Sequence, residues 1–182
     1  MRKRFGTHGA RLWHLAHGED HRRVSPNEPM KSVSNETTFE TDISDREELL
    51  TRLWFMAEKV AGRMKAKGLT GRTVTLKLRR KDFSALSRQT RLEEPSQLAD
   101  TLFREGRALL EALPETGPFR LIGIGYSDLT PADGRDPVGD LLDPQAGNRA
   151  KAERAADAIR AKFGAGAIAT GRGFAGKATK EN

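Results

Sequence analysis

The sequence predicts an α+β fold, in which a four-stranded βαββαβ sheet carries two helices on one face, with a short helical segment before it and a helical tail after it. Within residues 31–129, four stretches alternate apolar and polar residues with the period of a strand. Two other stretches repeat apolar residues with the period of a helix. Their order is strand, helix, strand, strand, helix, strand. Such a unit leaves the second face of its sheet uncovered.

The first expected element is a short helix within residues 5–18, "FGTHGARLWHLAHG", which Gly18 is placed to end. A polar stretch with two prolines follows, and this composition is typical of a linker. We therefore predict a helical segment over residues 1–24 and a tether over residues 25–30.

The strands are predicted from alternation. In the stretch "TVTLKLRRKDF", Val74, Leu76 and Leu78 share one side, and the residues between them are polar or cationic. Only Asp82 and Phe83 separate this strand from the next one, so the two are expected to form a hairpin. The four expected strands are residues 31–39, 73–81, 84–92 and 119–129.

The helices are predicted from apolar stripes and end signals. The first is expected to begin at Ser44, because Glu47 follows it at the spacing of a capping box, and to end at Gly68. The second is expected to open at Pro95 and Ser96. The stripes comprise Leu49, Leu50, Leu53, Ala57, Val60, Ala61 and Met64 in the first helix, and Leu98, Leu102, Phe103, Leu109, Leu110 and Leu113 in the second.

The last part of the chain has a different composition. Residues 130–147 are rich in proline, aspartate and glycine and are predicted to be a linker. In the basic tail, residues 148–182, a helix is expected between Asn148 as its N-cap and Gly164 at its end. The end of this tail has no packing pattern, which favours disorder.

Composition limits the classes of function. The chain has 182 residues, a formal net charge of +7 and no cysteine, which excludes disulfides and thiolate metal sites and favours a reducing, cytoplasmic setting. No apolar run approaches the length of a membrane span, and no apolar region follows the basic N-terminus as a secretory signal would require.

The positive charge is concentrated where a sheet face is predicted. Residues 69–93 contain seven Lys or Arg against two Asp or Glu. Alternation places Lys77, Arg79 and Lys81 on the side opposite the apolar residues, and so on the uncovered face. A solvated charged surface is the alternative, but confinement to one strand face favours a polyanionic partner.

Two other motifs carry weaker signals. Four histidines, His8, His14, His17 and His21, include an i,i+3 pair that could bind zinc, but no carboxylate or cysteine stands at a recurring ligand spacing, which favours exposed histidines. The stretch "GRGFAGK", residues 171–177, fits the first positions of a P-loop, but Ala178 replaces the magnesium-binding Ser or Thr.

Gly123 and Gly125 alternate with isoleucines in the last strand. Two interpretations remain open for them. They could flatten the uncovered face so that a ligand backbone approaches closely, or they could mark a β-bulge or a simple loss of packing.

We find no arrangement of residues suited to catalysis. Clustered carboxylates that could hold metal ions are not expected, because the acidic residues lie on outer helix faces or in the linker. From its residues alone, the chain is predicted to be a binding module.

The stretches "FGTHGARLWHLAHGEDHRRVSP", "KSVSNETTF", "LKLRRKDFSALSRQTRL" and "FRLIGIGYSDL", in this order, resemble the C-terminal portion of Y-family DNA polymerases of the bacterial DNA polymerase IV type. The first resembles the end of the thumb domain and its tether. Residues 31–129 resemble the little finger, also called the polymerase-associated domain. Residues 148–174 are similar to the tail of some bacterial members.

This resemblance implies that the uncovered face lies in the major groove of double-stranded primer–template DNA and grips phosphates of both strands. It also implies a part in translesion synthesis, damaged-DNA bypass and DNA repair. Lys77, Arg79 and Lys81 follow from both the alternation and the resemblance. The complete implied set of DNA-binding residues is Lys31, Ser32, Val33, Ser34, Lys77, Arg79, Lys81, Ser87, Arg88, Thr90, Arg91 and Arg120.

The sequence departs from the family in two respects. It contains no counterpart of the palm and fingers, so Mg2+ would belong to a catalytic polymerase portion elsewhere, and this chain is expected to hold no cofactor and not to polymerise alone. The tail has no motif for docking on a sliding clamp. Residues 97–103, "QLADTLF", loosely resemble that motif but fit the apolar stripe of the second helix.

Two other functions compete with DNA binding. An independent βαββαβ RNA-binding module would stack bases on aromatic residues of the uncovered face, where this sequence offers Lys, Arg, Thr and Ser instead. A protein-interaction domain would leave the one-sided row of cations unexplained.

Overall fold

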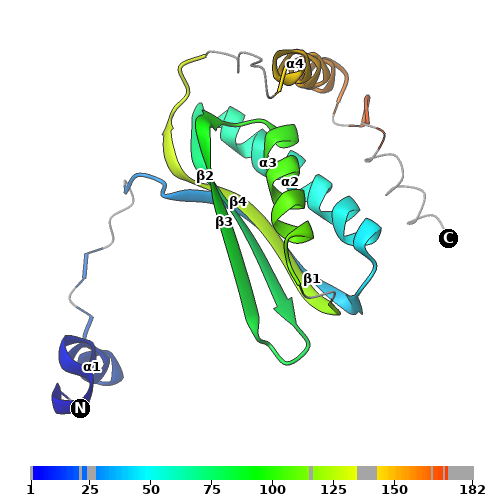
Figure 1. Ribbon diagram of the computed structural model, residues 1–182. Coiled ribbons are helices and arrows are strands. Elements are labelled where there is room, and N and C mark those ends of the chain that lie inside the picture. Colours follow the sequence, from blue (N-terminus) through cyan, green and yellow to red (C-terminus); the bar gives the residue numbers. More distant parts are fainter. Residues whose placement is uncertain are drawn as a thin grey trace.

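The computed structural model describes residues 2–20, 22–23, 28–114, 117–134, 143–164, 166–169 and 171. Four strands form one antiparallel sheet in the order β1-β4-β2-β3. The predicted α+β class and the βαββαβ order are confirmed, with one helix before the unit and one after it (Figure 1). The elements are α1 (Arg2–Ala16), β1 (Ser32–Ile43), α2 (Arg46–Ala66), β2 (Leu69–Arg80), β3 (Ala85–Ser96), α3 (Ala99–Glu111), β4 (Phe119–Pro131) and α4 (Ala146–Phe163).

Both helices of the βαββαβ unit pack on the same face of the sheet. Helix α2 contacts β1, β4 and β2, and helix α3 contacts β2, β3 and β4. Figure 1 shows the two helices side by side on one side of the sheet, and no other described helix is packed against the strands. We call the opposite face of the sheet the open face. None of the described helices is both long enough and apolar enough to cross a membrane.

The strand register explains which side chains face the helices. Val74 lies opposite Tyr126, and Leu76 lies opposite Ile124. Directly opposed residues of antiparallel strands point to the same face, so these apolar side chains form one layer, and all four are buried. The apolar stripes of α2 and α3 complete the core from the other side.

The predicted start of the first helix was wrong by one residue. Asp45, not Ser44, is the N-cap of α2, and its Oδ1 accepts a hydrogen bond of 2.8 Å from the backbone N–H of Glu48. Aspartate caps helices as well as serine does, and only the backbone path decides which of two neighbours can reach the third helical N–H. The predicted end near Gly68 is confirmed, with a φ of 60° at that glycine.

The ends of the hairpin also differ from the prediction. Strand β2 ends at Arg80, so Lys81 lies in the turn rather than on the strand. Strand β3 continues through Pro95 to Ser96, which pairs with Gly71 beyond a shift in register. Pro95 therefore does not open a helix. Proline is tolerated here because β3 is an edge strand and its pairing is irregular at this point.

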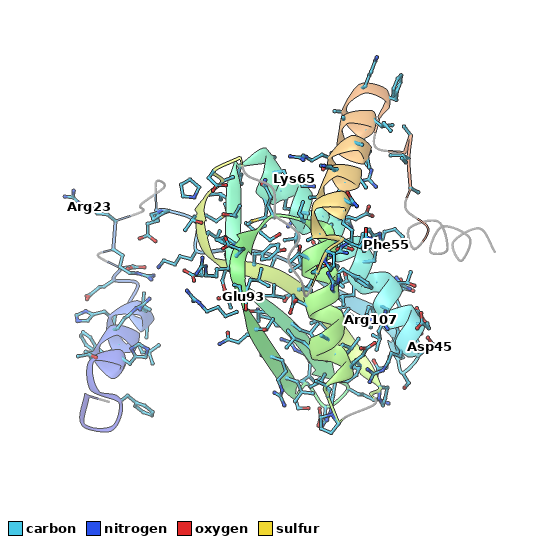
Figure 2. The ribbon with its side chains drawn as sticks, turned by 45° about the horizontal axis from the view of Figure 1, so that its top comes forward. Arg23, Asp45, Phe55, Lys65, Glu93 and Arg107 are labelled. Atoms are coloured by element: carbon cyan, nitrogen blue, oxygen red, sulfur yellow. The ribbon has the colours of Figure 1, made fainter. Side chains whose placement is uncertain are left out.

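Helix α4 packs against α2 and α3 through ion pairs, which sequence periodicity did not predict. Figure 2 labels Lys65, which lies near the end of α2 that faces α4. Its Nζ lies 2.5 Å from a carboxylate oxygen of Glu153 and 2.5 Å from one of Asp157, both in α4. The carboxylate of Glu153 also accepts hydrogen bonds of 2.9 and 3.2 Å from the N–H groups of Ala99 and Asp100. Glu153 thus caps α3, whose own N-cap residue provides no side-chain hydrogen bond.

The remaining expectations for the tail have mixed outcomes. Helix α4 begins at Ala146 after Gln145, so the prediction of Asn148 as N-cap was wrong, whereas its end at Gly164 is confirmed. The linker residues 135–142 and the end of the tail, residues 172–182, lie outside the described residues, and so does most of the P-loop-like stretch.

Candidate nucleic-acid interface

The open face is built from four rows of residues, each row crossing the four strands. Since opposed residues share a face, the register identifies every member. In the strand order β1, β4, β2 and β3, the rows are Thr38, Leu121, Arg79 and Ala85; Glu36, Gly123, Lys77 and Ser87; Ser34, Gly125, Thr75 and Gln89; and Ser32, Ser127, Thr73 and Arg91.

The chemistry of these residues is polar and cationic. Hydroxyl groups are the commonest side chain, and a hydroxyl can donate a hydrogen bond to a phosphate oxygen. No residue of the four rows is aromatic. The hydroxyl-bearing members are Ser32, Ser34, Thr38, Thr73, Thr75, Ser87 and Ser127.

A hollow lies over Gly123 and Gly125 near the middle of the face, and Ser34, Glu36 and Lys77 contribute to its lining. A Cβ on Gly125 would lie 2.4 Å from the Cβ of Ser34 and 2.6 Å from the carbonyl oxygen of residue 33. A Cβ on Gly123 would lie 2.7 Å from the Cβ of Glu36. The pairing with β1 is regular at both glycines, so the β-bulge interpretation is wrong at these positions. The glycines permit the close approach of β1 and leave the hollow.

The cations of the open face are held differently from one another. Lys77 lies 4.0 Å from Glu36, and Arg91 lies 2.9 Å from Asp128 of β4. Arg79 is exposed, and within the described part of the chain no carboxylate forms an ion pair with it. Arg79 is therefore available to an external anion without displacing an internal one.

The hairpin turn carries the next cation. Lys81 is exposed in this turn. The alternation had predicted it to lie on the strand face, and that prediction was wrong. The turn is tightened by Asp82, whose Oδ1 accepts hydrogen bonds of 2.6 Å from the hydroxyl of Ser84 and 2.9 Å from its N–H. These bonds hold the pKa of the Asp82 carboxyl below its usual range.

The predicted contact stretch in β3 is divided between the two faces. Ser87 and Arg91 belong to the open face, whereas Arg88 and Thr90 lie opposite Leu76 and Val74, on the side of the helices. Thr90 is half-buried there. Arg88 is nevertheless exposed because β3 is the edge strand, and its guanidinium donates to the carbonyl of Ser87. A DNA contact by Arg88 or Thr90 stays a prediction.

Arg120 lies at an irregular point of β4, where the pairing with both neighbouring strands shifts. Its Nε donates a hydrogen bond of 3.1 Å to Asp42, and its guanidinium lies 5.6 Å from the centre of the Phe83 ring. Its contact with phosphate also stays a prediction, and it would have to compete with Asp42.

The stretch before and within β1 lies along the border of the open face. Lys31 precedes the strand and is exposed, while Ser32 and Ser34 point to the open face. Val33 is buried on the helix side, so only its backbone is placed for a contact. Sequence reasoning missed Glu36 and Thr38, although the alternation of β1 beyond Ser34 was the signal that could have identified them.

The other candidates do not form a second site in the described chain. His14 pairs with Glu19, and the Nδ1–H of His17 donates to the carbonyl of Trp13, while His21 lies outside the described residues. No group of three or more His, Asp or Glu among the described residues could hold a metal ion. Leu102 and Phe103 of the clamp-motif-like stretch are buried in the core, as predicted.

Comparisons with known proteins agree with this architecture. Residues 30–137 match the impB/mucB/samB family C-terminal domain. The chain is 49% identical to DNA polymerase IV of Brucella melitensis over 174 residues, which is 96% of this chain and 39% of that protein. It is 42% identical to DNA polymerase IV of Caulobacter vibrioides over 177 residues, covering 97% of this chain and 43% of that protein. The chain therefore spans about two fifths of the length of these relatives.

A solved structure supports the fold. A Y-family DNA polymerase chimera superposes with a TM-score of 0.51 at 19% sequence identity, covering 68% of this chain and 35% of the chimera. The four-stranded sheet with its helices on one face matches the little-finger domain of that polymerase family. The chain belongs to the impB/mucB/samB family of Y-family DNA polymerases, and it carries the C-terminal, little-finger domain of that family.

Proposed function

We propose that the open face grips the phosphate backbone of double-stranded primer–template DNA, as the DNA-binding part of an error-prone polymerase that copies past damage. The single observation that carries the proposal is the composition of the four cross-strand rows, which are rich in hydroxyls and contain Lys77, Arg79 and Arg91. Lys77 and several hydroxyls line the hollow over the two glycines, together with Glu36. Such a surface provides charge and hydrogen-bond donors for phosphate but few groups that distinguish bases.

The composition of this face favours DNA backbone over single-stranded RNA. RNA-binding sheets stack unpaired bases on aromatic rings, and base stacking contributes about 1–3 kcal/mol per base. The open face has no ring in any of its rows. Its hydroxyls and cations suit a ligand whose exposed surface is phosphate.

In this proposal the chain acts with a catalytic polymerase portion, to which Mg2+ would belong, and has no polymerase activity alone. Its setting is the cytoplasm, where bacterial DNA is found. The proposed organisation is a thumb-like end over residues 1–24, a tether over 25–30 and the DNA-binding domain from residue 31. The sequence predicted this domain to end at residue 129 and a linker over 130–147, but β4 continues to Pro131 and α4 begins at Ala146, so we place the linker at residues 132–145 and the basic tail after it.

The test measures binding of a fluorescent primer–template duplex over a salt series. Each phosphate contact contributes about −0.9 to the slope of log affinity against log salt concentration. We expect the variant Lys77/Arg79/Lys81→Ala to flatten the slope by about two to three and to weaken binding equally for different sequences.

A matched control removes the same charge from other parts of the molecule. The control changes three exposed lysines: Lys59 within α2, Lys67 at the C-cap of α2, and Lys151 within α4. Their triple alanine variant should leave the slope nearly unchanged. Equal effects of both triple variants would show that net charge, and not the open face, drives binding. Preference for single-stranded RNA would support the RNA-binding module instead.

A further inference from the structure

Two carboxylates are associated with the cations of the open face. Glu36 belongs to the same row as Lys77, and their charged groups lie 4.0 Å apart across Gly123. Asp128 lies 2.9 Å from Arg91, the outermost member of its row. A surface that only had to bind phosphate strongly would be expected to exclude negative charge, so the presence of both carboxylates needs a reason.

The geometry of the second pair shows how the arginine is drawn inward. Arg91 is on β3 and Asp128 is on β4, and β2 lies between these two strands. The side chain of Arg91 therefore reaches across β2 to make the pair. Asp128 has a φ of 56°, in the left-handed region that non-glycine residues rarely adopt. An unfavourable backbone conformation persists only where the surrounding structure imposes it.

These pairs contribute little to folding. The side chains of Lys77 and Glu36 are 58% and 54% exposed, and those of Arg91 and Asp128 are 65% and 49% exposed. Ion pairs this exposed are weak because water competes for both partners. A role in stability is therefore a poor explanation for placing them on this face.

We propose that Glu36 and Asp128 limit the strength of the DNA grip by competing with phosphate for Lys77 and Arg91. This inference rests on the proposed function of the open face. A phosphate that approaches Lys77 meets the competing negative charge of Glu36, 4.0 Å from the ammonium group. The Glu36 carboxylate also contributes to the lining of the hollow, where it repels the phosphate. Contacts that exchange between an internal carboxylate and an external phosphate let a domain hold a duplex and still move along it.

The test compares Glu36→Gln and Asp128→Asn with the wild-type chain in the duplex-binding salt series. We expect each variant to bind about three- to tenfold more tightly at low salt. The salt slope should steepen by up to about 0.9 for each cation freed to release a counterion. Asparagine tolerates the left-handed conformation, so Asp128→Asn is expected to fold normally.

The control is Glu111→Gln, which breaks a comparable exposed pair. Glu111 lies 2.7 Å from Arg107 on α3, away from the open face, and the substitution removes the same charge. It should change affinity by less than about twofold if only the open face matters. In a Lys77→Ala background, the gain from Glu36→Gln should largely disappear, because the competition has lost its cation.

The outcomes separate this inference from the proposed function. A wild-type chain that binds duplex, with variants that match Glu111→Gln or bind more weakly, overturns the inference alone. A gain from Glu36→Gln that persists without Lys77 also overturns it, since repulsion alone would then be sufficient. A wild-type chain that does not bind duplex at low salt overturns the proposed function, and the inference with it.

Discussion

The substitution Gly125→Ala should destabilise the sheet although it adds only one methyl group. The added Cβ would lie 2.4 Å from the Cβ of Ser34 and 2.6 Å from the carbonyl oxygen of residue 33. Because backbone atoms are among the close neighbours, a side-chain rotation cannot relieve the contact, and β1 must move away from β4. Overpacking of this kind costs about 1–3 kcal/mol.

Alanine also reduces the conformational freedom of the unfolded chain, which offsets about 0.4–1 kcal/mol of that cost. We therefore expect the free energy of unfolding to fall by about 1–2 kcal/mol and Tm to fall by about 2–8 °C. Urea and thermal unfolding followed by circular dichroism would measure both quantities. Gly123→Ala should have a smaller effect, because its closest contact is the Cβ of Glu36 and the backbone lies 3.4 Å away.

The same substitution at Gly62 is the control. Gly62 lies within α2, and a Cβ there would have no atom within 4 Å. Alanine at this exposed helical position should stabilise the protein by up to about 1 kcal/mol. The two variants should thus shift stability in opposite directions. A Gly125→Ala protein as stable as the wild type would refute the close approach of β1 and β4 on which the hollow depends.

Three further predictions concern the helix ends and the attachment of α4. Asp45→Ala should lower the free energy of unfolding by about 1 kcal/mol, whereas Ser44→Ala should leave it nearly unchanged, as urea unfolding would measure. Glu153→Gln should cost about 1–2 kcal/mol and speed amide hydrogen exchange at the start of α3, and unchanged exchange there would contradict the cap. Hydrogen bonds from Arg149 and Arg104 hold the pKa of Asp143 in the folded protein below its usual range. The ionised carboxyl therefore stabilises the fold at a pH above the pKa that Asp143 has in the unfolded chain. This contribution is lost as the pH falls towards the pKa of Asp143 in the folded protein. In Asp143→Asn, the free energy of unfolding measured over an acid pH series should therefore fall less steeply with pH than in the wild type.

Periodicity predicted the elements well because it reports a property of each segment alone. The alternation that ends in Leu78 and the stripes of the two helices identify their buried sides without knowledge of their partners. The cap of α2 and the start of α3 could not be predicted in the same way. Asp45 and Ser44 are chemically equivalent caps, and the residues after β3 follow the pairing of Ser96 with Gly71, which is a contact between distant parts of the chain.

Only the part of the candidate site that depends on the pattern within a single strand could be predicted from the sequence. Alternation assigned Lys77 and Arg79 to the open face, and the register agrees. The resemblance assigned the whole contact stretch of β3 together, although neighbouring residues such as Ser87 and Arg88 point to opposite faces. The pairing of Arg91 with Asp128 brings together residues 37 positions apart. No pattern within either strand could indicate it.

The glycines and the cations of the open face can be tested separately, because the glycines affect both the stability of the sheet and binding, whereas the cations affect binding alone. A methyl group on Gly125 would both strain the sheet and fill the hollow, so it changes stability and binding together. Substitution of Arg79, whose side chain is exposed, should change binding and its salt slope but leave unfolding almost unaffected. If loss of affinity in Gly125→Ala exceeds the loss expected from its unfolded fraction, the shape of the hollow contributes to the grip in addition to its charge. If the loss equals that fraction, the glycines serve only to let the strands approach, and the hydroxyls and cations account for binding.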